Sequence, residues 1–207
     1  MSEVKPLNPI PLQQFIDKVK VADASKTPEI RLTLQDMGIG LNYMPNNISS
    51  NQKMRISETI QAYDAKSRLG LEFDPETEFL IANASRAAGD FSDAIARFNK
   101  FIVSYPDNKL VPEAWLCLSK IHIRRRDFDL SERELENATN LFANSANWSG
   151  MANSIMTRGT LEAGRDRLSV AEKYFKDAIE FSKEKNILRT EIRAMTNLGI
   201  LYWQTKD

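Results

Sequence analysis

The feature that most constrains the fold is a repeat in about the last two-thirds of the chain. Four segments align without internal gaps, and they start at Pro75, Pro112, Ala152 and Ile192. Neighbouring starts are separated by 37, 40 and 40 residues. A unit of this size cannot bury its own apolar face, so it has to stack on the next unit. The sequence therefore predicts an array of stacked units.

Each unit combines small and large side chains at fixed positions. One small residue lies in the middle of the first half of a unit, and another lies early in its second half. Large apolar residues follow and fill the groove between the two halves. The first small positions are Ala82, Ser119, Gly159 and Gly199, the second are Ala94, Ser131 and Ala171, and the large ones are Phe98, Leu135 and Phe175. This pattern predicts pairs of closely packed antiparallel helices.

At these positions the chain resembles the tetratricopeptide repeat family over roughly residues 75–207. The resemblance implies an all-α fold, in which helix pairs stack into a right-handed superhelix and the first helices line its concave face. The units exceed the usual length of about 34 residues and are similar to the longer units of kinesin light chains and bacterial peptide-sensing regulators. The tyrosine typical of the family is replaced by Ser85, His122 and Glu162.

We expect two regions, an irregular helical region over residues 1–70 and a repeat array over residues 71–207. The array divides into residues 75–111, 112–151 and 152–191 and a partial unit over 192–207. Within the first region we predict helices from Leu12 to Val21 and from Asn51 to Leu69. The segment Ile30–Leu34 alternates apolar and polar residues, so a strand and a helix both remain open.

Composition excludes several classes of function. Lys+Arg and Asp+Glu both number 28, so the formal net charge is zero, which disfavours nucleic-acid binding. The single Cys117 and the single His122 exclude a disulfide framework and the multi-cysteine and paired-histidine metal motifs. The 8 glycines form no phosphate-binding loop. We therefore predict no catalytic residue, no metal, no cofactor and no enzyme activity.

The chain has no apolar run of about 18 residues, so no membrane span is expected. The polar N-terminal residues have no secretory core, which predicts a cytoplasmic protein. We interpret His122 as a structural histidine, Cys117 as a packed thiol, and the run Arg124–Arg126 as charge at a helix end. Trp148 lies in the polar stretch 143–150, which we expect to link two units.

The concave face implied by the resemblance mixes amides, hydroxyls and cations. An amide can donate to and accept from an extended peptide, while Arg and Lys bind carboxylates. A partner protein or peptide of acidic character is therefore predicted, although a hydrated groove without a tight ligand remains open. The predicted ligand-binding residues of the groove are Asn83, Arg86, Lys120, Arg124, Asn153, Thr157, Arg193, Asn197 and Trp203.

The predicted function is that of a non-catalytic scaffold or adaptor, which holds a peptide or helix of a partner in the groove. The alternative is a regulatory module that senses a peptide and acts on residues 1–70. The last unit ends after its first helix, and three explanations remain open: a longer repeat protein, a final helix that serves as a cap, or self-association through the C-terminal helix.

Overall fold

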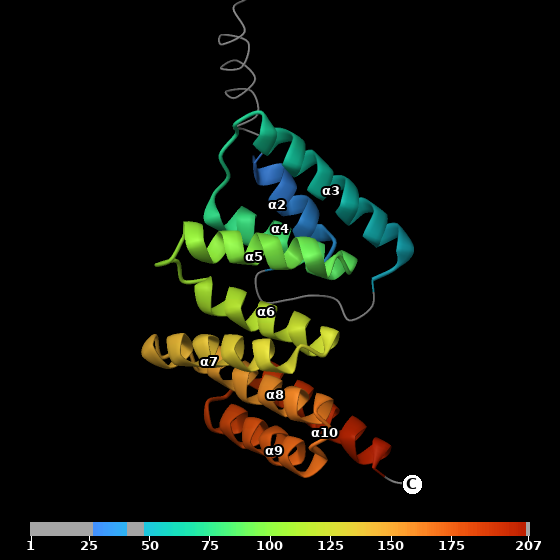
Figure 1. Ribbon diagram of the computed structural model, residues 1–207, viewed down its shortest axis with the longest axis vertical. Coiled ribbons are helices and arrows are strands. Elements are labelled where there is room, and N and C mark those ends of the chain that lie inside the picture. The colour runs from blue at the N-terminus through green and yellow to red at the C-terminus, as the bar shows by residue number, and fades with distance from the viewer. Residues whose placement is uncertain (1–26, 41–47, 206–207) are drawn as a thin grey trace, which may run out of the picture. The chain divides into compact units, whose positions relative to one another are not determined.

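The computed structural model describes residues 27–40 and 48–205, and within these ranges the chain is helical and contains no strand (Figure 1). The all-α prediction is confirmed for this part of the chain. The predicted helix from Leu12 to Val21 lies outside the described residues. The helices are α2 Thr27–Asp36, α3 Ser50–Arg68, α4 Pro75–Ala88, α5 Phe91–Ser104, α6 Val111–Arg125, α7 Phe128–Asn144, α8 Trp148–Gly164, α9 Leu168–Glu184 and α10 Leu188–Gln204.

The chain divides into two compact units, residues 1–90 and residues 91–207. The change of sequence pattern near residue 70 therefore does not coincide with the boundary between the units. Helix α4, which opens the predicted repeat array, belongs to the first unit, and α5 belongs to the second. The predicted pairing of these two helices stays a prediction.

In the first unit, α2, α3 and α4 pack around one apolar cluster. Ile30 and Leu34 of α2 are buried in it, whereas Leu32 between them is 56% exposed. On a strand all three side chains would share one face, but on a helix the middle one points away. The helix alternative for this segment is therefore confirmed, and the strand alternative is wrong.

The predicted helix from Asn51 to Leu69 is α3, and it begins with a capping box. The Ser49 side chain accepts from the N–H of Gln52, and the Gln52 side chain accepts from the N–H of Ser49. Helix α4 begins in a similar way, because Asp74 accepts from the N–H of Thr77. It ends at Gly89, whose φ of 93° suits glycine.

In the second unit each helix from α5 to α10 contacts the next along the chain, and α8 also contacts both α6 and α10 (Figure 1). Helices α7 to α10 each have 17 residues. Within the described ranges, none of the helices has the length and apolar character needed to cross a membrane.

The same turn follows each of the helices α6 to α9. A residue in the left-handed region recurs every 20 residues, at Arg126, Ala146, Asp166 and Asn186. The next residue then donates its N–H to the carbonyl five positions back, for example Asp127 to His122 at 2.9 Å and Ile187 to Ser182 at 2.8 Å. These are the bonds of a Schellman motif. Two steps of 20 residues account for the 40-residue spacing.

The predicted small residues bring helices together inside the second unit. Ser119 of α6 and Ser131 of α7 are both buried, and their hydroxyl oxygens lie 2.9 Å apart. At Gly159 of α8, a Cβ atom would lie 2.6 Å from the ring of Phe175 of α9. The close packing predicted for these helix pairs is confirmed.

Trp148 does not lie in a link between units, because α8 begins with it. The side chain of Asn147 accepts from the N–H of Gly150 at 2.9 Å and starts the helix there. The Trp148 ring packs edge-on against Phe181 of α9, with 6.4 Å between ring centroids. The expected link therefore ends at Asn147, and Trp148 joins α8 to α9.

Candidate binding surface

The predicted groove residues belong to helices of both compact units. Asn83 and Arg86 lie on α4 of the first unit. The other seven lie on α6, α8 and α10, and in the second unit α8 contacts both of the other two helices. A shared binding surface on the second unit can therefore draw only on these three helices.

Asn83 is an internal residue of the first unit and does not face a ligand. It is 1% exposed, and its amide nitrogen donates to the carbonyl of Gly40 at 2.9 Å. Its amide oxygen accepts from Arg86, at 3.0 Å from Nε and 2.7 Å from Nη2. Because buried amides need partners, both ends of Asn83 are used within the fold. The prediction that Asn83 binds a ligand is wrong, and Arg86 is held by Asn83.

Thr157 is also buried, at 2% exposure, so its predicted ligand contact is wrong. Its hydroxyl donates to the carbonyl of Asn153 one turn earlier on α8, at 2.7 Å. The side-chain oxygen of Asn153 accepts from Thr190 at 3.3 Å and from Arg193 at 3.4 Å. These contacts join α8 to α10, so Asn153 positions Arg193.

Four predicted groove residues other than Arg193 and Trp203 retain some exposure on the second unit, and one of them is the half-buried Asn153. Lys120 is half-buried and Arg124 is exposed, and they lie one turn apart on α6. Asn197 is half-buried and lies one turn after Arg193 on α10. Burial raises the pKa of Glu113 in the first turn of α6, while the charge of Lys120 opposes that rise. We name Lys120, Arg124, Arg193 and Asn197 the basic face.

Trp203 does not belong to the basic face. It is 80% exposed on α10. It follows Arg193 by ten residues and Asn197 by six, which turns its side chain about 80° and about 120° away from theirs around a helix. The prediction that Trp203 shares a groove with Arg193 and Asn197 stays a prediction.

His122 has a structural partner, as its interpretation predicted. The side chain is buried, and its Nδ1 atom lies 2.7 Å from Oε2 of Glu134 on α7. Burial raises the pKa of Glu134, and the contact with His122 opposes the rise. Cys117 on the same helix is also buried. Both side chains belong to the packing between helices.

The basic run lies at the C-terminal end of α6, as predicted. Arg125 pairs with Asp127 at 3.4 Å, and the Arg126 guanidinium lies 5.5 Å from the centre of the Phe128 ring. Positive charge at this end is favoured by the helix dipole.

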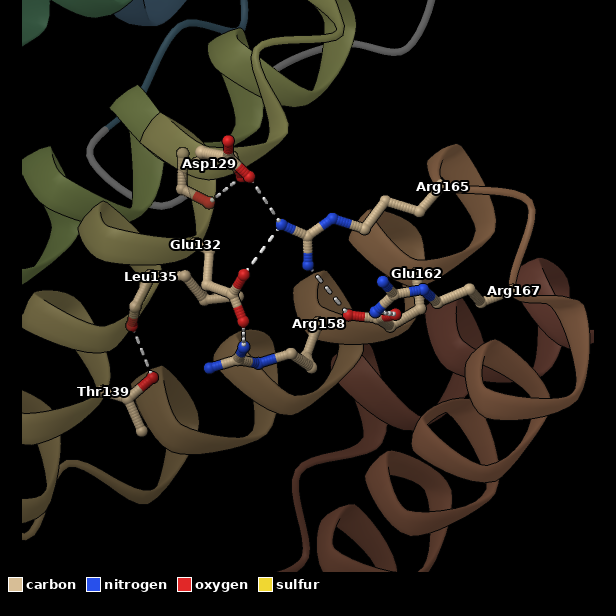
Figure 2. Close-up of polar contacts among 10 residues, drawn as sticks. Asp129, Glu132, Leu135, Thr139, Arg158, Glu162, Arg165 and Arg167 are labelled. Atoms are coloured by element: carbon tan, nitrogen blue, oxygen red, sulfur yellow. Dashed lines mark hydrogen bonds and ion pairs between the residues drawn. The ribbon is translucent and has the colours of Figure 1, made fainter.

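A network of charged side chains between α7 and α8 was not predicted from the sequence (Figure 2). Its centre is the Arg165 guanidinium, which donates to Glu132 at 2.7 Å, to Asp129 at 3.2 Å and to Glu162 at 3.4 Å. The hydrogen bond from Arg165 is the main cause that lowers the pKa of Glu132. The network ties the start of α7 to the end of α8.

Glu162 is the member of this network that the sequence could have indicated. It is buried and occupies a position that the family resemblance gives to a tyrosine. A buried carboxylate needs charged or polar partners, and Arg167 donates to it at 3.3 Å in addition to Arg165. With Arg158, which donates to Glu132 at 2.9 Å, three arginines balance three carboxylates. This charge balance suits a structural role.

Among residues 27–40 and 48–205, no group of three or more His, Cys, Asp or Glu side chains is arranged to hold a metal ion. Comparison with known proteins finds no family model that matches the chain and no curated protein that matches it. The resemblance to tetratricopeptide repeats therefore depends on the residues and contacts described above.

Proposed function

We propose that the chain is a tetratricopeptide-like repeat protein that acts as a non-catalytic scaffold and holds a segment of a partner protein on its first helices. The observation that carries this proposal is the basic face, whose exposed and half-buried side chains lie on α6 and α10. Repeat proteins commonly use a surface built from equivalent elements to hold an extended partner. No step of this function requires a nucleophile, a metal or a cofactor.

The regular turn supports a superhelical arrangement of the second unit. The left-handed residue recurs every 20 residues from Arg126 to Asn186, so successive helices are related by the same local geometry. A constant step between neighbours generates a superhelix. We propose that this superhelix is right-handed and that α6, α8 and α10 line its concave side.

The chemistry of the basic face favours an acidic segment as the ligand. Lys120 and Arg124 present two cations one turn apart, and Arg193 presents a third on α10. Guanidinium and ammonium groups form charge-assisted hydrogen bonds with carboxylates. The Asn197 amide can both donate to and accept from a peptide main chain. We therefore propose an extended peptide that contains Asp or Glu.

The test is selection of a displayed library of acidic peptides on the purified chain, followed by affinity measurement of the selected peptides. The variant K120A/R124A/R193A should weaken binding about tenfold or more, since a hydrogen bond to a charged group contributes about 1.5–3 kcal/mol. Lys173→Ala is the matched control, because it removes an exposed cation from α9. Equal binding by the triple variant and the control would show that the basic face is not the site.

A further inference from the structure

The cations of the basic face form two groups on different helices. Lys120 and Arg124 belong to α6, and Arg193 belongs to α10. Helix α8 contacts both of these helices and lies between them (Figure 1). The two groups of cations are therefore separated by at least the width of a helix, which is about 10 Å.

Both groups lie on the same face of the repeated helices. Positions 40 residues apart are equivalent, so Arg193 of α10 corresponds to Asn153 of α8 and Glu113 of α6. Arg193 donates to the side-chain oxygen of Asn153 at 3.4 Å, so this face of α10 adjoins the same face of α8. On α6, Lys120 and Arg124 follow Glu113 by seven and eleven residues, which brings their side chains back to within about 20° of its direction. One surface therefore holds all three cations.

The line that joins the two groups runs diagonally across α8. The position of α6 equivalent to Arg193 is an acid, Glu113, which repels a carboxylate of a ligand. The cations of α6 lie two and three turns closer to the C-terminal end of that helix. A ligand that contacts both groups therefore passes from the start of α10 to the end of α6.

The length of this diagonal follows from helix geometry. Neighbouring helices pack about 8–10 Å apart, so two such steps separate α6 from α10 by about 16–20 Å. The offset of seven to eleven residues along the helix adds about 10–16 Å in the perpendicular direction. The two groups are therefore about 20–25 Å apart. An extended chain, at about 3.3 Å per residue, covers this distance in about six to eight residues.

Helix α8 offers uncharged polar groups along the diagonal. Asn153 is half-buried and Thr160 is exposed. Arg158 of the same helix is directed toward α7, where it donates to Glu132 at 2.9 Å. The part of a ligand that crosses α8 therefore needs no acidic residue.

We propose that the basic face is bipartite and that its ligand is an extended segment with two acidic clusters about six to eight residues apart. This inference rests on the proposed function, and it adds a spacing that a general preference for acidic peptides does not require. When one cluster binds its group of cations, it holds the second cluster near the other group. Binding at both groups is therefore tighter than binding at either alone.

The probe is a set of fluorescent peptides of equal length and identical composition, each with two Glu-Glu pairs in a Gly/Ser background. The pairs are separated by two, seven or twelve residues, and binding to the full chain is followed by fluorescence anisotropy at constant salt. We expect the seven-residue spacing to bind at least tenfold more tightly than the two-residue spacing, which cannot reach both groups. The twelve-residue spacing should lose affinity gradually, because a longer flexible linker lowers the effective concentration.

Variants of the chain assign the two ends of the ligand. Arg193→Ala should weaken binding of the seven-residue spacing at least tenfold and leave the two-residue spacing nearly unchanged, so the preference for spacing disappears. The variant K120A/R124A should weaken binding of both peptides. Lys173→Ala on α9 is the matched control, because it removes an exposed cation elsewhere and should keep the preference. Circular dichroism checks that each variant is folded.

Two results would overturn the bipartite arrangement and leave the proposed function in place. One is equal affinity of the unmodified chain for all three spacings, which would mean that one acidic cluster is enough. The other is a preference for the seven-residue spacing that survives Arg193→Ala, because α10 would then not hold the second cluster. If none of the acidic peptides bound, the proposed function would fail, and this inference would fail with it.

Discussion

Helices α8 and α10 carry equivalent residues in different surroundings. Gly159 and Gly199 are separated by 40 residues, and both follow the same left-handed turn. At Gly159 the Phe175 ring fills the adjacent space, whereas at Gly199 that space is open. A glycine in the middle of a helix lowers the stability of that helix. Its net effect on the stability of the protein therefore depends on how closely a second helix packs against it. The comparison separates the cost of the residue from the benefit of the packing.

The largest effect should come from removing the side chain that covers α8. Phe175→Ala should lower the free energy of unfolding by about 3–5 kcal/mol, because it leaves a cavity beside Gly159. Trp203→Ala, at a position of α10 that is 80% exposed, should change it by less than about 0.5 kcal/mol. Urea unfolding followed by circular dichroism measures both. Similar losses for the two variants would mean that Trp203 is packed within the fold.

The second effect concerns the turn after α8. Arg165→Gln should lower the free energy of unfolding by about 1–3 kcal/mol, because buried Glu162 loses a charged partner. The equivalent position after α10 is Thr205, and Thr205→Gln should produce no measurable change. Combining Arg165→Gln with Glu162→Gln should restore part of the loss. If the double variant restored none of the lost stability, the loss would come from the contact of Arg165 with Glu132 instead.

Replacing each of the two glycines by alanine should change the free energy of unfolding in opposite directions. Gly159→Ala should lower the free energy of unfolding by about 1–2 kcal/mol, because the added methyl group presses on Phe175 by more than the helix gains. Gly199→Ala should raise it by about 0.5–1 kcal/mol, since alanine favours helix and meets open space. Thermal unfolding at matched concentrations gives the sign. A loss in both variants would mean that Gly199 is also closely packed.

The smallest effect extends the comparison to α6, where Glu113 is equivalent to Asn153 and Arg193. Burial raises the pKa of Glu113 above the ordinary 4.5. The folded chain therefore binds this proton more tightly, and the carboxylate reduces stability as the pH rises above about 4.5. Glu113→Gln should remove that decrease and stabilise the protein at pH 7.

Unfolding titrations at pH 4.5 and pH 7 measure this effect. Glu132→Gln is the control of opposite sign, because its pKa is lowered and its stabilising contribution is lost as the pH falls. If Glu113→Gln were less stable than the unmodified chain at pH 7, hydrogen bonds or the helix dipole would outweigh the burial.

The helix pairs could be predicted from the sequence because their contacts are local. The small residues Ser119 and Gly159 indicate close packing wherever the helix period places them opposite a neighbouring helix. The choice between strand and helix at Ile30–Leu34 depended on which side Leu32 faces, and only tertiary packing decides that.

The candidate site was predicted less well than the fold. Asn83 and Thr157 have the chemistry of ligand contacts, but the same hydrogen-bonding groups satisfy the fold when the side chain is buried. The contacts of Arg165 join residues up to 36 positions apart, and local sequence spacing does not indicate them.

The most direct test of the central comparison is thiol labelling at equivalent positions of α8 and α10. Ala152 is 0% exposed and Ile192 is 54% exposed, and they are separated by 40 residues. Ala152→Cys and Ile192→Cys should be made separately, with buried Cys117 as the internal reference for slow modification. The account predicts that maleimide modifies Ile192→Cys at least tenfold faster than Ala152→Cys. Equal rates would contradict it, because these equivalent positions of α8 and α10 would then be equally covered.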